Sequence, residues 1–411
     1  MESIEILSGI SLNMIHSVKF KSTNICILIR QPLVREFATM NALLPMVLQR
    51  GCSKYGSLPK INEFTEKLYG SVFECQIMKK GEQQIILIFM EIVNVAKENL
   101  VLKALEFLKE IMLRPLIEGA GFKKEYVDGE KQNLAAAIKG RINNKTEYAK
   151  LRCLEEMCIN EPFGLYGDGY IEDLDSITPE LLYQHYSHLL KTAPIDFVIM
   201  GNENMDVIRQ HTAKLFQFER GSVTPIPTEP SNYEGKPGLV TEYAQMAQSK
   251  LCVGIRSGIL PVGREVYELM VLNEVLGGGA NSKLFVNLRE KEHLCYDIYS
   301  LMYRFKGIIL IQCGLDAGNF EKTVQLIKKE LGNLTNAEDV QSAKTSLLAK
   351  LKGIQDYPAA VMDFYVSQKM LGDPDSIEEA MDRIKEVDAN KLEPLAKRLT
   401  ISTIYQLTKE G

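Results

Sequence analysis

The sequence predicts an α+β fold made of two homologous domains, each a mostly antiparallel β-sheet with helices packed on one face. Three observations indicate this fold class. The chain has 411 residues, and a domain of about 200 residues can bury its own core. A segment rich in proline and glycine, at 219–238, is typical of an extended linker. Apolar runs before this segment recur after it in the same order, which predicts domains at 1–218 and 239–411 arranged as a clamshell.

The first repeated elements are a strand and a helix. Residues 24–30 and 249–256 are short runs rich in β-branched residues, each with a cysteine and an arginine in register, and we expect both to be buried strands. A loop containing Arg-Glu follows each strand. Apolar residues within 37–48 and 266–276 then recur at the spacing of one helix face. Glycines end both predicted helices, at 51 and at 277–279.

The later elements repeat as well. Thr178 and Asp388 are suited to cap two late helices, and Pro179 to occupy a first helical position. The matching pairs are strands at 81–89 and 306–312, helices at 97–113 and 320–334, helices after the two caps, and closing strands at 195–200 and 404–407.

Composition and charge narrow the class of protein. The 48 basic and 53 acidic residues are mixed along the chain and no basic block occurs, which argues against nucleic acid as the main partner. No apolar run approaches the roughly 18 residues that a membrane span needs. The N-terminus lacks the cationic start of a signal peptide, and the eight cysteines form no C-x-x-C pair. We therefore expect reduced thiols and a cytoplasmic protein that does not contact a membrane.

The most informative motif occupies residues 277–296 and reads Gly-Gly-Gly-Ala-Asn-Ser-Lys-Leu-Phe-Val-Asn-Leu-Arg-Glu-Lys-Glu-His-Leu-Cys-Tyr. Its glycines lack the spacing of a phosphate-binding loop, so they indicate either a flexible turn lining a cavity or a helix end. Arg289 and Tyr296 carry directional donors that can hold a carbonyl without titrating near neutral pH. From spacing alone, a surface arginine in a charged helix and a core tyrosine are the favoured interpretation, because such pairs are common.

This motif resembles the C-terminal half of the pitrilysin/insulinase-type zinc peptidases, a family that includes mitochondrial processing peptidase and small bacterial zinc proteases. The shared features are a small-residue turn, the run Leu-Phe-x-x-Leu-Arg-Glu-Lys, and a tyrosine seven residues after the arginine. The linker, the repeat and residues 122–138 extend the resemblance over essentially the whole chain. It implies that Arg289 and Tyr296 bind peptide substrate, through backbone carbonyls near the scissile bond.

The family carries H-x-x-E-H on a helix ahead of a glycine, and this chain does not. Aligning Gly51 with that glycine places Ala42 and Met46 at the two histidine positions and Pro45 at the glutamate position. None of these side chains can bind zinc or deprotonate a water molecule. A shift in register does not help, since residues 36–52 contain no histidine. A mid-helix proline is also expected to kink the helix.

No other site for a metal or a nucleophile is indicated. Glu125 and Glu130 lie where the family has its third zinc ligand, but without two histidines we expect a solvated helix charge there. His185 and His188 share a helix face, yet no third ligand is indicated. The nucleophile motif G-x-S-x-G is absent. The sequence therefore predicts no catalytic residue and no cofactor in this chain, with zinc expected only in a partner.

The resemblance implies a non-catalytic subunit of a heterodimeric metallopeptidase. In several bacterial relatives the zinc motif and the Arg/Tyr pair lie on separate chains, and this chain matches the second kind at Arg289 and Tyr296. The expected partners are a zinc-bearing homologous subunit and a peptide, with a homodimer as another possibility. The alternatives are a structural or assembly subunit, as in respiratory-complex core proteins of this family, a stand-alone peptide binder, and an enzyme with an unrecognised site.

Overall fold

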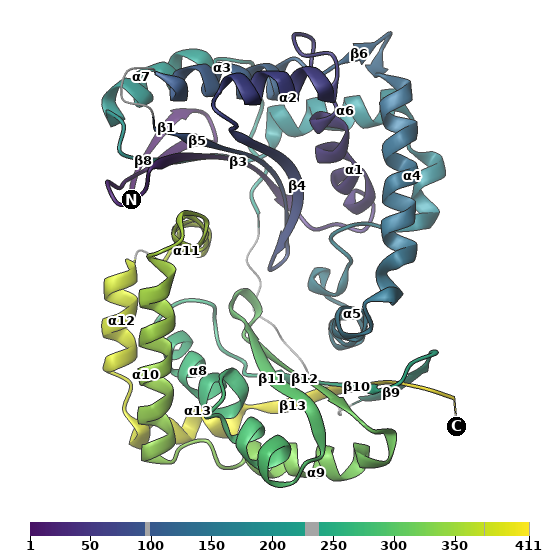
Figure 1. Cartoon of the computed structure of the whole chain (residues 1–411), viewed down its shortest axis with the longest axis vertical. Helices are drawn as coiled ribbons and strands as arrows, with labels where there is room; N and C mark the ends of the chain where they lie inside the picture. The colour runs from purple at the N-terminus through teal and green to yellow at the C-terminus, as the bar shows by residue number, and fades with distance from the viewer. Residues whose placement is uncertain (95–98, 227–237, 374, 411) are drawn as a thin grey trace. The chain divides into compact units, whose positions relative to one another are not determined.

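The computed structural model describes residues 1–94, 99–226, 238–373 and 375–410, which form two units (Figure 1). One unit comprises Met1–Gly140 with the segment that begins at Leu165, and the other comprises Arg141–Gly164 with the C-terminal part of the chain. Most of the predicted linker at 219–238 lies outside the described residues, as do positions 97 and 98 of one predicted helix.

The first unit is built on a six-stranded sheet with the order β1-β2-β8-β3-β5-β4. All neighbours pair antiparallel except β2 and β8, which are parallel. Pairing along both edges satisfies the backbone of β3, whose β-branched side chains suit a buried strand. The strands are β1 (Glu2–Leu7), β2 (Ile10–His16), β3 (Ser22–Pro32), β4 (Val72–Lys80), β5 (Gln83–Val93) and β8 (Ile195–Gly201).

Helices cover one face of this sheet (Figure 1). Ile27 and Ile88 pair across β3 and β5 and belong to the buried core with Leu43 and Phe107 of two covering helices. The predicted cap is present, because Thr178 accepts a hydrogen bond from the main-chain N–H of Leu181. The helices are α1 (Ala38–Gln49), α2 (Leu58–Lys67), α3 (Leu100–Leu113), α4 (Lys124–Gly140), α6 (Pro179–Thr192) and α7 (Met205–Leu215), with a short ribbon of β6 (Ile117–Glu118) and β7 (Gly121–Phe122).

The second unit repeats this plan with a five-stranded sheet of order β11-β12-β10-β13-β9. The central strand β10 pairs antiparallel with β12 and β13, as β3 does with β5 and β8. The repeat found in the sequence is therefore a repeat of topology, and the predicted fold class of two α+β domains is confirmed. The strands are β9 (Gly238–Tyr243), β10 (Ser249–Arg256), β11 (Cys295–Tyr303), β12 (Ile308–Leu315) and β13 (Thr400–Thr408).

The helices of the second unit include two π-helical turns, η4 (Glu274–Gly278) and η5 (Phe285–Lys291). η4 continues directly from α8 and includes Gly277 and Gly278 of the glycine-rich motif, and η5 lies within that motif. Such turns are rare and often occur at functional sites. The α-helices are α8 (Arg264–Asn273), α9 (Phe320–Leu331), α10 (Ala337–Ile354), α11 (Pro358–Leu371), α12 (Ile377–Lys385) and α13 (Glu393–Arg398).

One helix departs from the predicted domain division. The predicted boundary at 218 places 141–164 in the first domain, whereas its contacts group this segment with the second unit. The reason is packing: α5 (Lys145–Met157) covers a face of the second sheet, where its apolar side chains join a buried cluster. That cluster includes Ala149, Cys153 and Met157 from the helix and Cys252, Leu310 and Tyr405 from the sheet.

A buried charge cluster holds the end of this segment to β10. Arg256 donates to the main-chain carbonyl of Met157 at 2.7 Å and pairs with Glu161. Lys306 contacts the other oxygen of Glu161 at 2.8 Å. The side chains of Arg256 and Lys306 are only 6% and 2% exposed, so Glu161 supplies the negative charge that makes their burial tolerable.

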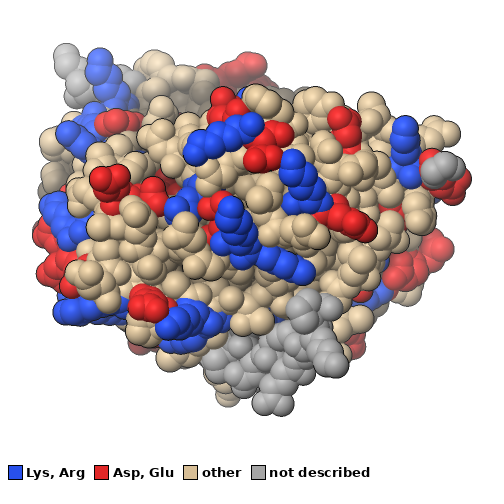
Figure 2. Space-filling model, turned by 90° about the horizontal axis from the view of Figure 1, so that it is seen from below, with Lys and Arg blue, Asp and Glu red and all other residues tan. Residues whose placement is uncertain are grey.

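Within the described residues, no helix combines the length and hydrophobicity that crossing a bilayer requires. Figure 2 shows one face of the molecule, on which basic and acidic side chains are interspersed. The mixture of signs seen along the chain is thus also found on this surface.

We expect Glu161→Gln to lower the free energy of unfolding by about 3–5 kcal/mol, because it removes the carboxylate that neutralises two buried cations. Urea unfolding measures the change. Glu393→Gln is the matched control, since Glu393 pairs with Lys397 at the surface and its loss should leave the stability close to that of the wild type. Equal losses in the two variants would contradict the assigned role of Glu161.

Candidate functional site

Arg289 and Tyr296 line the same pocket in the second unit. Arg289 lies on η5, and Tyr296 lies at the start of β11, the next strand in the chain. The pocket has a volume of about 360 Å³. Its lining residues are Arg289, Glu290, His293, Leu294, Cys295, Tyr296 and Asp316. The structure therefore brings together the two residues that the sequence singled out.

The guanidinium of Arg289 is supported from one side and open on the other. Its Cζ lies 4.6 Å from the centroid of the Phe285 ring, a cation–π contact within η5. Its ion pair with Glu290 is long, at 3.7 Å, and the side chain is 41% exposed. A guanidinium held in this way keeps donors available for an acceptor in the pocket.

Tyr296 owes its position to a β-bulge. Cys295 pairs with Leu315 and Asp297 pairs with Gly314, so Tyr296 is the extra residue on β11. A bulge re-aims the side chain at its position, and the tyrosine is 52% exposed. The alternative that it is a core tyrosine is therefore wrong.

Asp316 is a site residue that the sequence did not reveal. It follows the end of β12, and its two carboxylate oxygens each lie 3.2 Å from the phenol oxygen of Tyr296. This hydrogen bond and the negative charge raise the pKa of Tyr296, so the phenol keeps its proton at neutral pH. The hydrogen bond between Tyr296 and Asp316 joins strand β11 to the residue directly after the neighbouring strand β12. It could have been predicted only from the register in which these strands pair.

The turn that connects η5 to β11 is strained. His293 has a φ of 51°, in the left-handed region that non-glycine residues seldom adopt. Such strain persists where the surroundings impose it, and it occurs preferentially at binding and catalytic sites. Here the turn lies between the π-helical turn that carries Arg289 and the bulge that carries Tyr296, and all three border one pocket.

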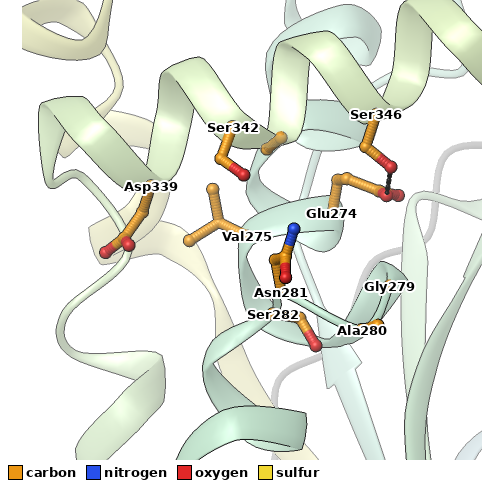
Figure 3. A pocket seen from close by; sticks show the side chains of 10 residues that line it. Glu274, Val275, Gly279, Ala280, Asn281, Ser282, Asp339, Ser342 and Ser346 are labelled. Atoms are coloured by element: carbon orange, nitrogen blue, oxygen red, sulfur yellow. Dashed lines mark hydrogen bonds between the residues drawn. The ribbon is translucent and has the colours of Figure 1, made fainter.

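The glycine-rich turn lines a second pocket, of about 210 Å³, against α10 (Figure 3). Buried Glu274 accepts hydrogen bonds from Ser346 at 2.6 Å and from Lys350 at 2.7 and 2.8 Å. Lys350 also donates to the carbonyl of Gly278 at 2.6 Å. A Cβ at Gly278 would lie 2.2 Å from a Glu274 oxygen, so a side chain at this position would displace that carboxylate. The turn is thus fastened to α10 by side chains.

In the first unit, the positions aligned with the zinc motif lie on α1. Ala42 and Pro45 are buried and Met46 is partly buried, so these three side chains contribute packing and no metal-binding group. The helix continues past Pro45 to Gln49. Among the described residues, no group of three His, Cys, Asp or Glu side chains is placed to hold a metal ion.

A buried chain of amide groups lies beside these positions. Gln84 donates to the carbonyls of Ala38 and Gly167, so its amide oxygen is the atom that accepts from Asn41 at 2.8 Å. The amide oxygen of Asn41 then accepts from Nε2 of His185 at 2.6 Å. Burial lowers the pKa of His185 to about 4, which makes the ring neutral at pH 7 with its proton on Nε2. His185 is a structural residue here.

The two candidate third-ligand carboxylates differ in environment. Glu125 is exposed and pairs with Lys123 at 2.7 Å, as expected of a solvated helix charge. Glu130 is buried, and for it that expectation is wrong. It pairs with Arg50 at 3.3 Å and accepts from Asn133 at 3.0 Å. The arginine at the end of α1 supplies a positive charge for this carboxylate, and the sequence did not reveal that contact.

The comparisons with known proteins agree on one family. A family model described as "Peptidase M16 inactive domain" matches residues 176–347. The "Probable inactive metalloprotease YmfF" of Bacillus subtilis (strain 168) is 28% identical over 407 residues, covering 97% of this chain and 96% of that protein. The "Uncharacterized zinc protease YmxG" of the same strain is 26% identical over 168 residues, covering 39% of this chain and 41% of that protein.

A solved structure extends the likeness to the whole fold. The "conserved protein from Enterococcus faecalis V583" has a TM-score of 0.90 and 27% identity, and the match covers 100% of this chain and 98% of that one. Fold and site define an M16-type peptidase fold without the zinc-binding motif. In sequence and fold the chain is similar to the pitrilysin/insulinase-type (M16) peptidases, the family that the Leu-Arg-Glu-Lys motif and the repeat indicated.

The environment of His185 predicts a pH dependence of stability. Its folded pKa, about 4, lies below the ordinary value of 6.5, so protonation favours the unfolded chain. Its contribution to stability is present above pH 6.5 and is lost as the pH falls towards 4, by about 3 kcal/mol in all. Urea unfolding across this range should show a shallower decline for His185→Gln than for the wild type. His16→Gln, at an exposed histidine on β2, is the control, and a slope for His185→Gln identical to that of the wild type would contradict the assignment.

Proposed function

We propose that this chain is the zinc-free subunit of a two-chain M16-type metallopeptidase in the cytoplasm. It would bind peptide substrate and complete the active site of a zinc-bearing homologous partner. The observation that carries the proposal is the pocket in which Arg289 and Tyr296 converge, in a chain whose α1 has Ala42, Pro45 and Met46 at the family's zinc positions.

The chemistry of the two sites supports this division of roles. α1 offers no group at those three positions that could bind a metal or activate water, so hydrolysis requires the partner's zinc and its general base. The guanidinium of Arg289 is charged at any physiological pH and presents several donors in a fixed plane, which suits a peptide carbonyl. An open pocket of about 360 Å³ has room for a short length of extended peptide.

The relatives supply a pairing of the kind that the proposal requires. Bacillus subtilis (strain 168) has both a protein named as a probable inactive metalloprotease and one named as a zinc protease, and each is similar to this chain. A source organism that encodes one chain of each kind could assemble a mixed complex. By analogy, the partner of this chain would be a similar-sized homologue that carries H-x-x-E-H.

The test is peptide hydrolysis by the mixed complex with the double variant Arg289→Ala/Tyr296→Phe. We expect kcat/KM for a fluorogenic peptide to fall by about tenfold or more, because charge-assisted and neutral hydrogen bonds to substrate are lost together. Size-exclusion chromatography should show an intact complex, since both side chains are exposed.

Arg264→Ala/Tyr357→Phe is the matched control, because both of these residues are exposed and lie outside the pocket. Its kcat/KM should equal that of the wild type. Hydrolysis that is unchanged in the pocket variant would overturn the proposal.

A second candidate is a peptide-binding or assembly protein with no role in proteolysis. The site itself favours it in one respect: Tyr296 is oriented by Asp316, a residue of the same chain, so the pocket is formed without a partner. Peptide binding by the purified chain, together with failure to form a complex with zinc-bearing homologues of the same organism, would support this candidate over the first.

A further inference from the structure

The hydrogen bond between Tyr296 and Asp316 has a direction that bears on how a peptide is held. A phenol has one proton to donate and lone pairs that accept, whereas an ionised carboxylate only accepts. The phenol oxygen lies 3.2 Å from each oxygen of Asp316, so its proton points to that carboxylate. What Tyr296 then presents to the pocket is a hydrogen-bond acceptor.

Arg289 presents the opposite character. A guanidinium has five N–H donors and no acceptor, and this one is 41% exposed and its ion pair with Glu290 is long, at 3.7 Å. The pocket therefore combines a donor on η5 with an acceptor on β11. An extended peptide main chain carries both complementary groups, a carbonyl oxygen and an N–H.

The arrangement is held in place by main-chain and side-chain contacts. The bulge places Tyr296 beside the end of β12, where Asp316 begins the turn to α9. Asn319, in that turn, donates from its main-chain N–H to the carbonyl of Asp316 at 2.9 Å. Its side chain donates to the carbonyl of Leu294 at 3.1 Å. The main-chain segments that carry the carboxylate and the phenol are thus held together before a ligand arrives.

We propose that Asp316 is a positioning residue that makes Tyr296 the acceptor for a main-chain N–H of the peptide, while Arg289 donates to a main-chain carbonyl. This inference rests on the proposed peptide-binding function. It states which of the two side chains donates a hydrogen bond to the peptide and which accepts one. It replaces the expectation that both side chains donate to carbonyls. A pocket of this kind recognises extended backbone whatever the side chains of the peptide.

Fluorination of the phenol tests the direction of the bond. Tyr296→3-fluorotyrosine makes the phenol a better donor and a poorer acceptor with little change in size. The probe is fluorescein-labelled oxidised insulin B chain, an unstructured peptide, and its Kd for the purified chain is measured by fluorescence anisotropy at mildly acidic pH, where the phenol is protonated. We expect Kd to rise about threefold, the scale of a weakened neutral hydrogen bond. Tyr357→3-fluorotyrosine, at an exposed tyrosine outside the pocket, should leave Kd unchanged.

A double-mutant cycle tests the role of Asp316. Asp316→Ala frees the phenol to rotate, so we expect weaker binding and little further loss when Tyr296→Phe is added. A spectroscopic readout separates positioning from a general structural defect. Because Asp316 raises the pKa of Tyr296, the phenol of the Asp316→Ala variant should ionise at lower pH than in the wild type. The signal is the difference in ultraviolet absorbance between each protein and its Tyr296→Phe counterpart.

The outcomes distinguish this inference from the function on which it rests. If the wild type does not bind the probe, or if Tyr296→Phe binds it equally well, the peptide-binding function is wrong. If binding needs Tyr296 but tightens on fluorination, Tyr296 donates to the peptide and the inference alone is overturned. Additive losses in the cycle would also overturn the positioning role of Asp316.

Discussion

The structure of each unit depends on one central strand that is hydrogen-bonded along both edges. β3 lies between β5 and β8, and β10 lies between β12 and β13. Because a buried backbone must find partners for all its polar groups, these strands determine where their neighbours lie and in which register. The pocket that contains Arg289 and Tyr296 depends on this pairing, since the register of β10 with β12, and of β12 with β11, brings Asp316 next to Tyr296.

The pocket forms where regular pairing is interrupted. Arg289 lies on a π-helical turn. His293, whose φ is in the left-handed region, lies between this turn and β11, and Tyr296 lies at a β-bulge and is exposed. Each irregularity costs a modest amount of conformational free energy. Together they accompany the placement of two exposed polar side chains, Arg289 and Tyr296, beside one pocket. In the second pocket, the absence of a side chain at Gly278 leaves the space that the Glu274 carboxylate occupies. The surrounding sheet and helices give these irregular segments a rigid base.

The first unit shows the complementary case. Where relatives of this family would hold zinc, α1 contributes packing, and the polar groups nearby satisfy one another. Asn41 joins Gln84 to a neutral His185, and Glu130 pairs with Arg50. Loss of the motif therefore leaves buried amides and a buried carboxylate that are compensated within the chain. The polar groups beside α1 are therefore satisfied by hydrogen bonds and ion pairs within the chain.

The sequence by itself determined the α+β class, the repeat, the central strands and the absence of H-x-x-E-H, because these depend on local periodicity and on residue identity. It also singled out Arg289 and Tyr296, through a motif that is contiguous in the chain. Only the tertiary structure decided that α5 packs on the second sheet, that Glu130 is buried against Arg50, and that Asp316 orients Tyr296. Each of these depends on contacts between segments far apart in sequence or on strand register, which the pattern of residues along one segment does not encode.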